Sequence, residues 1–314
     1  MLNQNVLEKL FKDYIADCEY SKGLSPATIS SYKDVFRTFH TIMPEVKILE
    51  DVHPQMFNEF FRRINTRERK VGRDTIKRGI KQSTTRTYYN KLIAFYSWLE
   101  RYGYLEKGSI TKKVIKPKSP QYDDERALKQ SEVNKIMTAI TLNTLKDEFI
   151  RSRDMAIILI LLYTGIRKGE LLGLRIQDVD FESQNIYVRA ETSKSKKSRH
   201  IPMHFSLITH LKSYLKRRKE KGFSTSKLIV SSRQDKGLTQ HGLKFWVTKY
   251  SKLSGISFHI HRFRHTFACT LGKNNVDIIS IMNMLGHSTT RMTEQYLRSI
   301  KTTISRDFIN KISY

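Results

Sequence analysis

The chain has 314 residues, and its 57 Lys and Arg against 30 Asp and Glu give a formal net charge of +27. Such a charge favours a polyanionic partner, most simply nucleic acid. The longest apolar run, residues 155–163, is too short for a membrane span, which needs about 20 residues, and no membrane partner is expected. The first residues lack a signal-peptide pattern, and Cys18 and Cys269 are too few for a disulfide framework. We therefore expect a cytoplasmic protein.

The first third of the chain predicts helices, at about residues 6–18, 25–43, 54–64 and 83–102. Ser25, followed by Pro26, and Ser83 are N-terminal capping signals for the second and fourth of these helices. Residues 1–110 should therefore form a small all-helical domain. The stretch that follows contains Pro117 and Pro120 and changes from basic to acidic without apolar periodicity, which predicts a linker at residues 111–124.

Residues 125–314 predict a mixed domain. A helix opens near Gln130, and the apolar run 155–163 indicates a helix buried on all sides, which Gly165 is well placed to end. Short strands are expected at residues 179–181, 186–188 and 200–202, followed by helices from about residue 206 almost to the end. The predicted fold class is thus mainly α: a helical domain, then an α+β domain with a small antiparallel sheet.

Basic residues are concentrated between the third and fourth predicted helices, where Lys77, Arg78, Lys81 and Arg86 are candidates for DNA contact. A single charge run is often only a solvated face, but further lysines in the linker share the same sign. These runs favour a surface that follows a duplex, and such phosphate contacts position a protein without specifying sequence.

A set of residues suited to phosphodiester chemistry lies in the second domain: Arg167, His261, Arg264, His287 and Tyr296. Arginines pair with phosphate oxygens, histidines donate or move protons, and a tyrosine oxygen can attack phosphorus. Each residue alone would usually have only a structural role. Tyr296, for example, is one of fifteen tyrosines in the chain. No Asp or Glu cluster with metal-ligand spacing accompanies the set, so neither a metal nor another cofactor is expected.

The arrangement resembles the tyrosine recombinase (phage integrase) family. Arg264 precedes His287 by 23 residues, and His287 precedes Tyr296 by nine. Upstream, Thr164-Gly165-Ile166-Arg167 is followed by Glu170-Leu171. The resemblance covers nearly the whole chain and is stronger in the second domain. It implies a SAM-like core-binding domain before a catalytic domain, in the two-domain layout of Xer-like or mobile-element recombinases.

The resemblance also implies the role of each residue. Tyr296 would form a 3′-phosphotyrosyl intermediate without metal or ATP, while Arg167, Arg264 and His287 stabilise the phosphorus. Lys194 stands eight residues before Pro202, the family's place for a lysine that protonates the leaving 5′ oxygen, although Lys196 and Lys197 lie close by.

One further residue, Glu170, completes the predicted site. His261 belongs to the same site, and Glu170 would support it. A second His-x-x-Arg register, His259 with Arg262, competes with His261 and Arg264. The family interval to His287 favours the latter.

The resemblance implies double-stranded DNA with paired inverted half-sites as the partner. It also implies a homotetramer on DNA and a monomer or dimer off DNA. In the tail, Ile300, Ile304, Phe308 and Ile312 give an apolar stripe that would pack on a neighbouring subunit or on its own. The site-specific recombinase has two alternatives, a type IB-like topoisomerase and a non-catalytic DNA-binding protein. Integrase, invertase and dimer resolvase all stay open as biological roles.

Overall fold

The structure is a computed structural model that describes residues 6–71, 75–118, 127–193 and 196–297. The chain forms two compact units, residues 1–122 and 123–314. In the described part of both units, no helix is long and apolar enough to cross a membrane.

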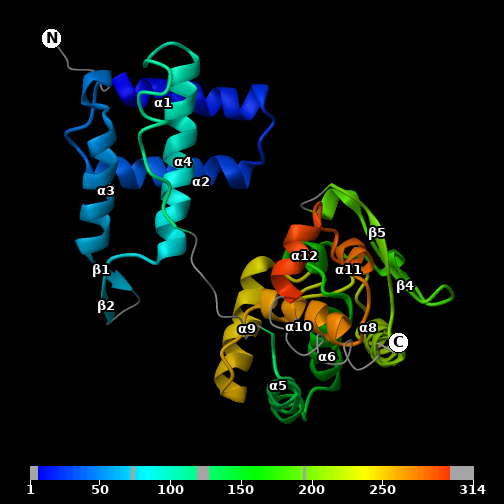
Figure 1. Cartoon of the computed structure of the whole chain (residues 1–314). Coiled ribbons are helices and arrows are strands. Elements are labelled where there is room, and N and C mark those ends of the chain that lie inside the picture. Colours follow the sequence, from blue (N-terminus) through cyan, green and yellow to red (C-terminus); the bar gives the residue numbers. More distant parts are fainter. Residues whose placement is uncertain (1–5, 72–74, 119–126, 194–195, 298–314) are drawn as a thin grey trace, which may run out of the picture. The chain divides into compact units, whose positions relative to one another are not determined.

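The first unit contains the four predicted helices. Figure 1 shows two of them lying across the other two. Their bounds are α1 (Val6–Ala16), α2 (Pro26–Ile42), α3 (Pro54–Thr66) and α4 (Gln82–Arg101). A short π-helix (Asp17–Ser21) extends α1, and a 3-10 turn (Leu49–Asp51) precedes α3.

Aromatic side chains fill the core of this unit. Phe11 stacks on Phe36 with 3.7 Å between ring centroids, and Phe95 meets Phe11 edge-on at 5.3 Å. Burial of such rings supplies most of the stabilising free energy, and the ring pairs add to it. The Glu100 carboxylate at the end of α4 accepts hydrogen bonds from the backbone N–H groups of residues 108, 110 and 111. The chain therefore stays attached to this unit beyond α4.

The capping predictions have different outcomes. Ser25 is confirmed as the N-cap of α2, since its hydroxyl accepts a hydrogen bond from the Thr28 N–H. Ser83 is wrong as the N-cap of α4, because that position is taken by Lys81, whose side chain makes no capping hydrogen bond. The extended backbone of Lys81 (φ −68°, ψ 147°) allows the helix to begin at Gln82, so Ser83 lies inside the first turn.

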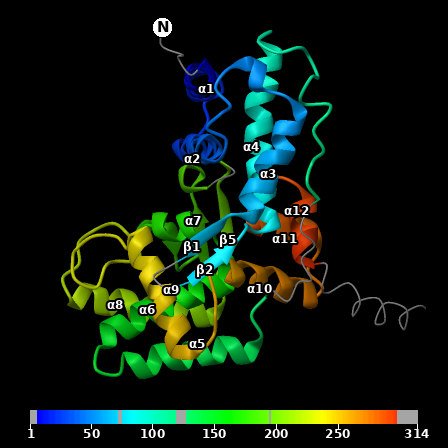
Figure 2. The ribbon, with the colours of Figure 1, turned by 90° about the vertical axis from the view of Figure 1, so that its left-hand side faces the viewer.

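A β-hairpin between α3 and α4 corrects the expectation of an all-helical first domain. It consists of β1 (Glu68–Val71) and β2 (Thr75–Arg78), paired antiparallel with Arg69 opposite Lys77 (Figure 2). Every residue of β2 is exposed, including Ile76 at 67%. Because neither face of β2 is buried, the sequence lacks the alternation of apolar residues that signals a strand. Backbone pairing holds the hairpin, helped by a hydrogen bond from the Arg69 side chain to the Gly79 carbonyl.

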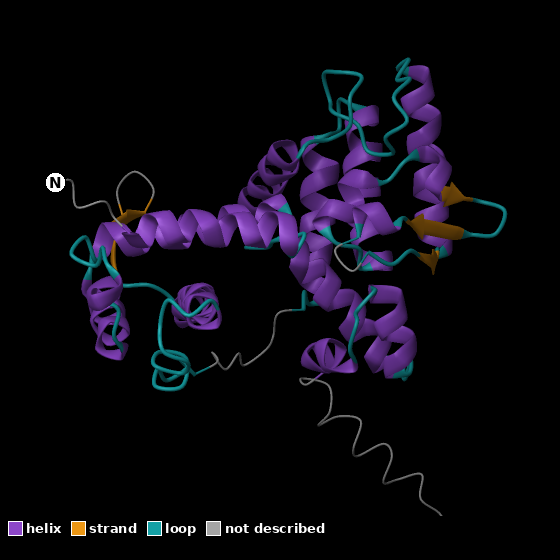
Figure 3. Cartoon of the chain, turned by 90° about the horizontal axis from the view of Figure 1, so that it is seen from above, coloured by secondary structure: helices purple, strands orange, loops and turns teal. Residues whose placement is uncertain are grey.

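The second unit is mainly helical, and the strands form a small part of it (Figure 3). Its helices are α5 (Gln130–Asn143), α6 (Glu148–Thr164), α7 (Lys168–Gly173), α8 (Phe205–Glu220), α9 (Gln240–Ser254), α10 (Ile260–Lys273), α11 (Ile278–Leu285) and α12 (Thr290–Leu297). The central helix is α6, which packs against α5, α8 and α10. Residues 156–161 of its apolar run are buried as predicted, whereas Met155, Leu162 and Tyr163 are only partly buried, and Gly165 ends the helix in the left-handed conformation (φ 58°).

The predicted antiparallel sheet is confirmed in the second unit. It has the order β3-β4-β5, with β3 (Val179–Asp180), β4 (Asn185–Val188) and β5 (Arg199–Pro202). Ile186 and Ile201 are paired across β4 and β5, and both are buried. Strand β5 also contacts α11, which brings one end of the sheet next to the residues described below.

Candidate active site

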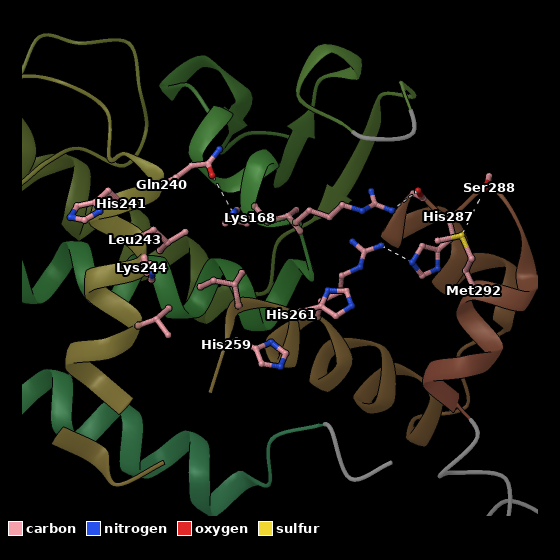
Figure 4. Close-up of a pocket in the computed structure, with 16 residues that line it drawn as sticks. Lys168, Gln240, His241, Leu243, Lys244, His259, His261, His287, Ser288 and Met292 are labelled. Atoms are coloured by element: carbon pink, nitrogen blue, oxygen red, sulfur yellow. Dashed lines mark hydrogen bonds between the residues drawn. The ribbon is translucent and has the colours of Figure 1, made fainter. Parts of the chain in front are cut away.

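An open pocket of about 1020 Å³ in the second unit brings together side chains from distant parts of the chain. Arg167, His261, Arg264 and His287, all predicted from the sequence, line this pocket. Figure 4 shows His261 and His287 extending from α10 and from the segment between α11 and α12. Sequence reasoning missed the opposite wall, where α9 contributes Gln240, His241 and Lys244, because a surface helix of this kind carries no chemical motif.

Arg167 is positioned by the start of helix α7, where it is the N-cap. Its backbone N–H donates to the Glu170 carboxylate at 2.8 Å, and its Nη1 donates to the same carboxylate at 3.0 Å. Its Nη2 donates to the Gly286 carbonyl at 3.1 Å. These hydrogen bonds fix the guanidinium in place. Because the side chain is still 21% exposed, the guanidinium is also open to the pocket.

Glu170 joins two arginines, one of which the sequence had not assigned to the site. Arg199 of β5 donates from Nη1 and Nη2 to the Glu170 carboxylate at 3.1 and 2.8 Å. Burial opposes ionisation of Glu170, but the hydrogen bonds and charge of Arg199, with those of Arg167, outweigh it and lower the Glu170 pKa to about 2. The carboxylate is therefore charged at neutral pH. In the sequence, Arg199 was visible only as part of the strand that ends at Pro202.

Arg264 is almost fully buried, with 1% exposure. Its Nη1 donates to the Gly165 carbonyl at 2.8 Å, and its Nη2 donates to the Leu285 carbonyl at 2.6 Å. Arg262, of the competing register, instead forms an ion pair with Glu132 at 3.1 Å and does not line the pocket. The structure thus directs Arg264, and not Arg262, toward the other site residues.

Three arginines meet the C-terminal end of helix α11. Arg199 donates from Nε to the Met284 carbonyl at 2.6 Å, while Arg264 and Arg167 donate to the next two carbonyls, those of Leu285 and Gly286. These carbonyls carry the negative end of the helix dipole, so cations are favoured beside them. Gly286 ends the helix in the left-handed conformation (φ 62°). The helix end therefore gathers positive charge at the pocket, which Arg167 and Arg264 line.

His287 follows Gly286 and is 7% exposed. Its Nε2 lies 2.8 Å from Nη2 of Arg264, and its Nδ1 lies 2.8 Å from the hydroxyl of Thr293. Burial, together with the charges of Arg264 and Arg167, lowers the His287 pKa to about 3. The imidazole is therefore neutral at pH 7.

The two histidines of the His-x-x-Arg motifs lie near the start of α10, and both line the pocket. His259 is the N-cap of the helix and His261 is in its first turn. Both side chains are exposed, and the His261 ring is perpendicular to that of His265, with 4.9 Å between centroids. Either imidazole can therefore meet a molecule that enters the pocket.

Two predicted residues are not placed at the atomic level. Lys194 lies outside the described residues, while the neighbouring Lys196 and Lys197 are exposed. The backbone of Tyr296 lies in α12, nine residues after His287, and its side chain is not described. Within the described ranges, no group of three or more His, Cys, Asp or Glu side chains is arranged to hold a metal ion.

The candidate DNA-contact residues lie in the first unit. Lys77 and Arg78 are on β2, Lys81 precedes α4, and Arg86 is in α4. The first three are exposed and Arg86 is half-buried. Earlier in the same basic run, the side chains of Arg62 and Arg63 both bind Glu59, at 2.6 to 2.7 Å. Part of the run is thus neutralised locally.

Comparison with known families decides the identity. Residues 126–302, more than half of the chain, match the model of the phage integrase family. The chain belongs to the phage integrase family. As a member of this family of tyrosine recombinases, it is a DNA breaking-rejoining enzyme of the site-specific recombinase type.

Its relatives include Xer proteins. The chain is 27% identical to tyrosine recombinase XerC of Oceanobacillus iheyensis, covering 95% of this chain and 93% of that protein. It is 32% identical to tyrosine recombinase XerA of Thermococcus onnurineus, covering 65% and 68%.

Solved structures of a recombinase and of an integrase share the fold. The XerH site-specific recombinase in a post-cleavage complex with palindromic difH substrate has a TM-score of 0.71 and 20% identity, covering 92% of this chain and 81% of that one. The integrase of the Tn1549 transposon with a circular intermediate DNA has a TM-score of 0.70 and 18% identity, covering 95% and 98%.

Proposed function

We propose that this integrase cuts and rejoins double-stranded DNA by attack of the Tyr296 hydroxyl on a scissile phosphate. The attack forms a 3′-phosphotyrosyl bond and breaks the bond from phosphorus to the 5′ oxygen, which Lys194 protonates as it leaves, giving a free 5′ hydroxyl. Because the phosphoester bond energy is retained in the protein–DNA bond, the reverse attack by a 5′ hydroxyl rejoins the strand without ATP.

The pocket's set of fixed cations supports this proposal above all. Arg167 and Arg264 are held by backbone carbonyls before any DNA is present. Donors that are fixed in advance stabilise the charge of a pentavalent phosphorus without reorganising during the reaction. His287 lies beside Arg264, and His261 lines the same pocket, where a histidine can take the proton of the attacking hydroxyl. These groups would serve in place of the paired metal ions of many nucleases.

Cleavage and rejoining of this kind require duplex DNA as the partner. We propose that the first unit, with Lys77, Arg78, Lys81 and Arg86, is the core-binding domain and contacts the duplex backbone, while the second unit carries the reaction. The structural neighbours were solved as complexes, XerH with a palindromic difH substrate and the Tn1549 integrase with a circular intermediate DNA. For this chain we propose paired inverted half-sites, four subunits assembled on DNA, and action in the cytoplasm.

The deciding experiment is capture of the covalent intermediate on a suicide substrate, a duplex nicked near the cleavage site so that rejoining fails. A library of duplexes that carry candidate half-sites from the DNA flanking the gene would supply the substrate. The wild-type chain should accumulate a protein–DNA adduct in EDTA. Tyr296→Phe should bind the same duplex and form no adduct, because only the attacking oxygen is removed.

Two outcomes would contradict the proposal. Adduct formation by Tyr296→Phe would mean that another residue is the nucleophile. A strict requirement for Mg²⁺ would mean that the fixed cations do not suffice. Relaxation of a supercoiled plasmid without strand exchange between paired sites would favour the type IB-like topoisomerase instead.

A further inference from the structure

Thr293 has a contact that the proposed chemistry has not used. It lies in helix α12, its side chain is fully buried, and its hydroxyl is 2.8 Å from Nδ1 of His287. Tyr296 is three residues further along the same helix, a rise of about 4.5 Å. The contact thus joins the helix of the proposed nucleophile to a histidine of the pocket.

The second ring nitrogen of His287 determines the direction of this hydrogen bond. Nε2 lies 2.8 Å from Nη2 of Arg264. A guanidinium has only N–H donors, so Nε2 must be the acceptor. A neutral imidazole then carries its single proton on Nδ1, and the Thr293 hydroxyl accepts it. The charge of Arg264 beside Nε2 favours the same neutral state.

We propose that Thr293 is a positioning residue: its hydroxyl accepts the Nδ1 proton of the tautomer that Arg264 imposes, and so holds the His287 ring with Nε2 beside Arg264 at the pocket. The role of this site in strand cleavage is the proposed function above, on which the consequence for activity rests. The tautomer itself rests only on the two hydrogen bonds of the His287 ring. A valine at position 293 has nearly the same shape but leaves the buried Nδ1–H without its acceptor, whereas serine retains the hydroxyl.

Nitrogen NMR of the histidine rings tests the tautomer without any DNA. The full chain is labelled with ¹⁵N and measured at pH 7.5, and the His287→Gln variant assigns the His287 signals. We expect a protonated Nδ1 and an unprotonated Nε2 in the wild type. Thr293→Ser should keep the wild-type Nδ1 chemical shift, whereas Thr293→Val should move it, because the Nδ1 proton loses its acceptor while Arg264 still donates to Nε2. A wild-type ring protonated on Nε2, or an unchanged Nδ1 chemical shift in Thr293→Val, would overturn the proposal.

Adduct formation on the suicide substrate tests the consequence. Thr293→Val should form the adduct about tenfold more slowly, and Thr293→Ser should stay within about threefold of the wild type, at unchanged DNA affinity. In a His287→Gln background, Thr293→Val should cause no further slowing, because the two residues act through one hydrogen bond. A role confined to packing of α12 would instead make the two effects multiply.

The two measurements separate the inference from the function. If the wild type forms no adduct, the proposed function fails and the ring signals alone decide the tautomer. If the wild type forms adduct and Thr293→Val matches it, the positioning role is overturned. The thermal midpoint would reveal whether Thr293→Val folds poorly. In that case Thr293→Ala is used to remove the hydroxyl, and Thr293→Ser, which retains it, should restore the rate. Failure of serine to restore the rate would then count against the role.

Discussion

Glu170 shows how single residues prepare this pocket for an anion. It neutralises part of the charge of Arg167 and Arg199 and holds both guanidinium groups in place through three hydrogen bonds, and a fourth comes from the Arg167 backbone N–H. Without a carboxylate there, the two cations would face each other in a buried space, at high electrostatic cost. The remaining positive charge is left facing the pocket, where a phosphate would compensate it.

Lys194 gives the first prediction at the scale of the residue. If it protonates the leaving 5′ oxygen, Lys194→Ala should slow cleavage of normal DNA by about 10² to 10⁴, the usual range for a general acid. A substrate with a 5′-phosphorothiolate bridge should restore most of the rate, because sulfur leaves without a proton. Single-turnover cleavage of both substrates is the measurement. Lys196→Ala is the matched control and should behave nearly normally. Equal impairment of Lys194→Ala on both substrates would argue against this role.

His287 gives a prediction about pH. Its pKa is lowered from 6.5 to about 3 in the folded chain, so folding favours the neutral ring. The stability that this provides is fully present above pH 6.5 and is lost as the pH falls toward 3. Between pH 6 and pH 4.5, the wild type should lose about 1.4 kcal/mol of unfolding free energy per pH unit more than His287→Gln. Glu170, whose pKa is lowered, contributes to acid unfolding only below about pH 4.5.

Urea unfolding of both proteins at pH 7.5, 6 and 5 measures this difference. Other titrating groups are common to the two proteins and cancel. Parallel pH profiles for wild type and His287→Gln would show that the ring is not held neutral.

Helix ends are the elements that build the site. Helix α6 ends at Gly165 and α11 ends at Gly286, and the carbonyls of both glycines accept hydrogen bonds from site arginines. Both glycines have positive φ, at which a side chain is strained. The turn that ends each helix therefore also presents a carbonyl to a guanidinium.

Gly165→Ala tests this element. A Cβ there would lie 2.4 Å from the Phe267 ring, in addition to the cost of positive φ. The matched control is Gly255→Ala at the end of α9, where φ is +69° and a Cβ would meet nothing within 4 Å. We expect Gly255→Ala to lower the unfolding free energy by about 1–2 kcal/mol. Gly165→Ala should cost a further ~1–3 kcal/mol from overpacking. Urea unfolding of the two variants measures both free energies. Equal losses of unfolding free energy would show that the close approach to the Phe267 ring does not matter.

At the scale of the whole molecule, two compact units share a net charge of +27. Each neutralised phosphate should contribute about 0.9 to the slope of log affinity against log salt concentration. Binding strength and cleavage are therefore expected to respond to different residues, the exposed cations in the first case and the pocket in the second. Because different residues are expected to govern binding and cleavage, loss of the nucleophile should leave DNA affinity intact.

The tail gives the prediction at this scale. Its apolar stripe, Ile300 to Ile312, lies outside the described residues. If it passes to a neighbouring subunit, four subunits would close into a ring on DNA. Deletion of residues 301–314 should then preserve binding to a single half-site, weaken cooperative binding to two, and abolish recombination. Gel-shift titration on one and two half-sites measures this. Unchanged cooperativity, or loss of folding, would favour packing of the tail on its own subunit.

Local order was readable from the sequence alone. The helices, the buried run of α6, the caps at Ser25 and Gly165 and the three-stranded sheet follow from patterns within a few neighbouring residues. The motif spacings from Arg264 to Tyr296 carried the family resemblance, which the family match then confirmed. The exposed hairpin was missed because a strand with no buried face leaves no apolar alternation.

Only the tertiary structure decided how the site is held together. Arg199 reaches Glu170 across 29 residues, and Arg167 reaches Gly286 across 119, because β5, α7 and α11 pack at one place. Arg167, Arg199 and Arg264 all donate to backbone carbonyls, and every residue of a chain has a backbone carbonyl. The sequence alone therefore does not indicate which backbone carbonyls will accept a hydrogen bond from an arginine. That is decided only when the helices pack and bring particular arginine side chains next to particular helix ends.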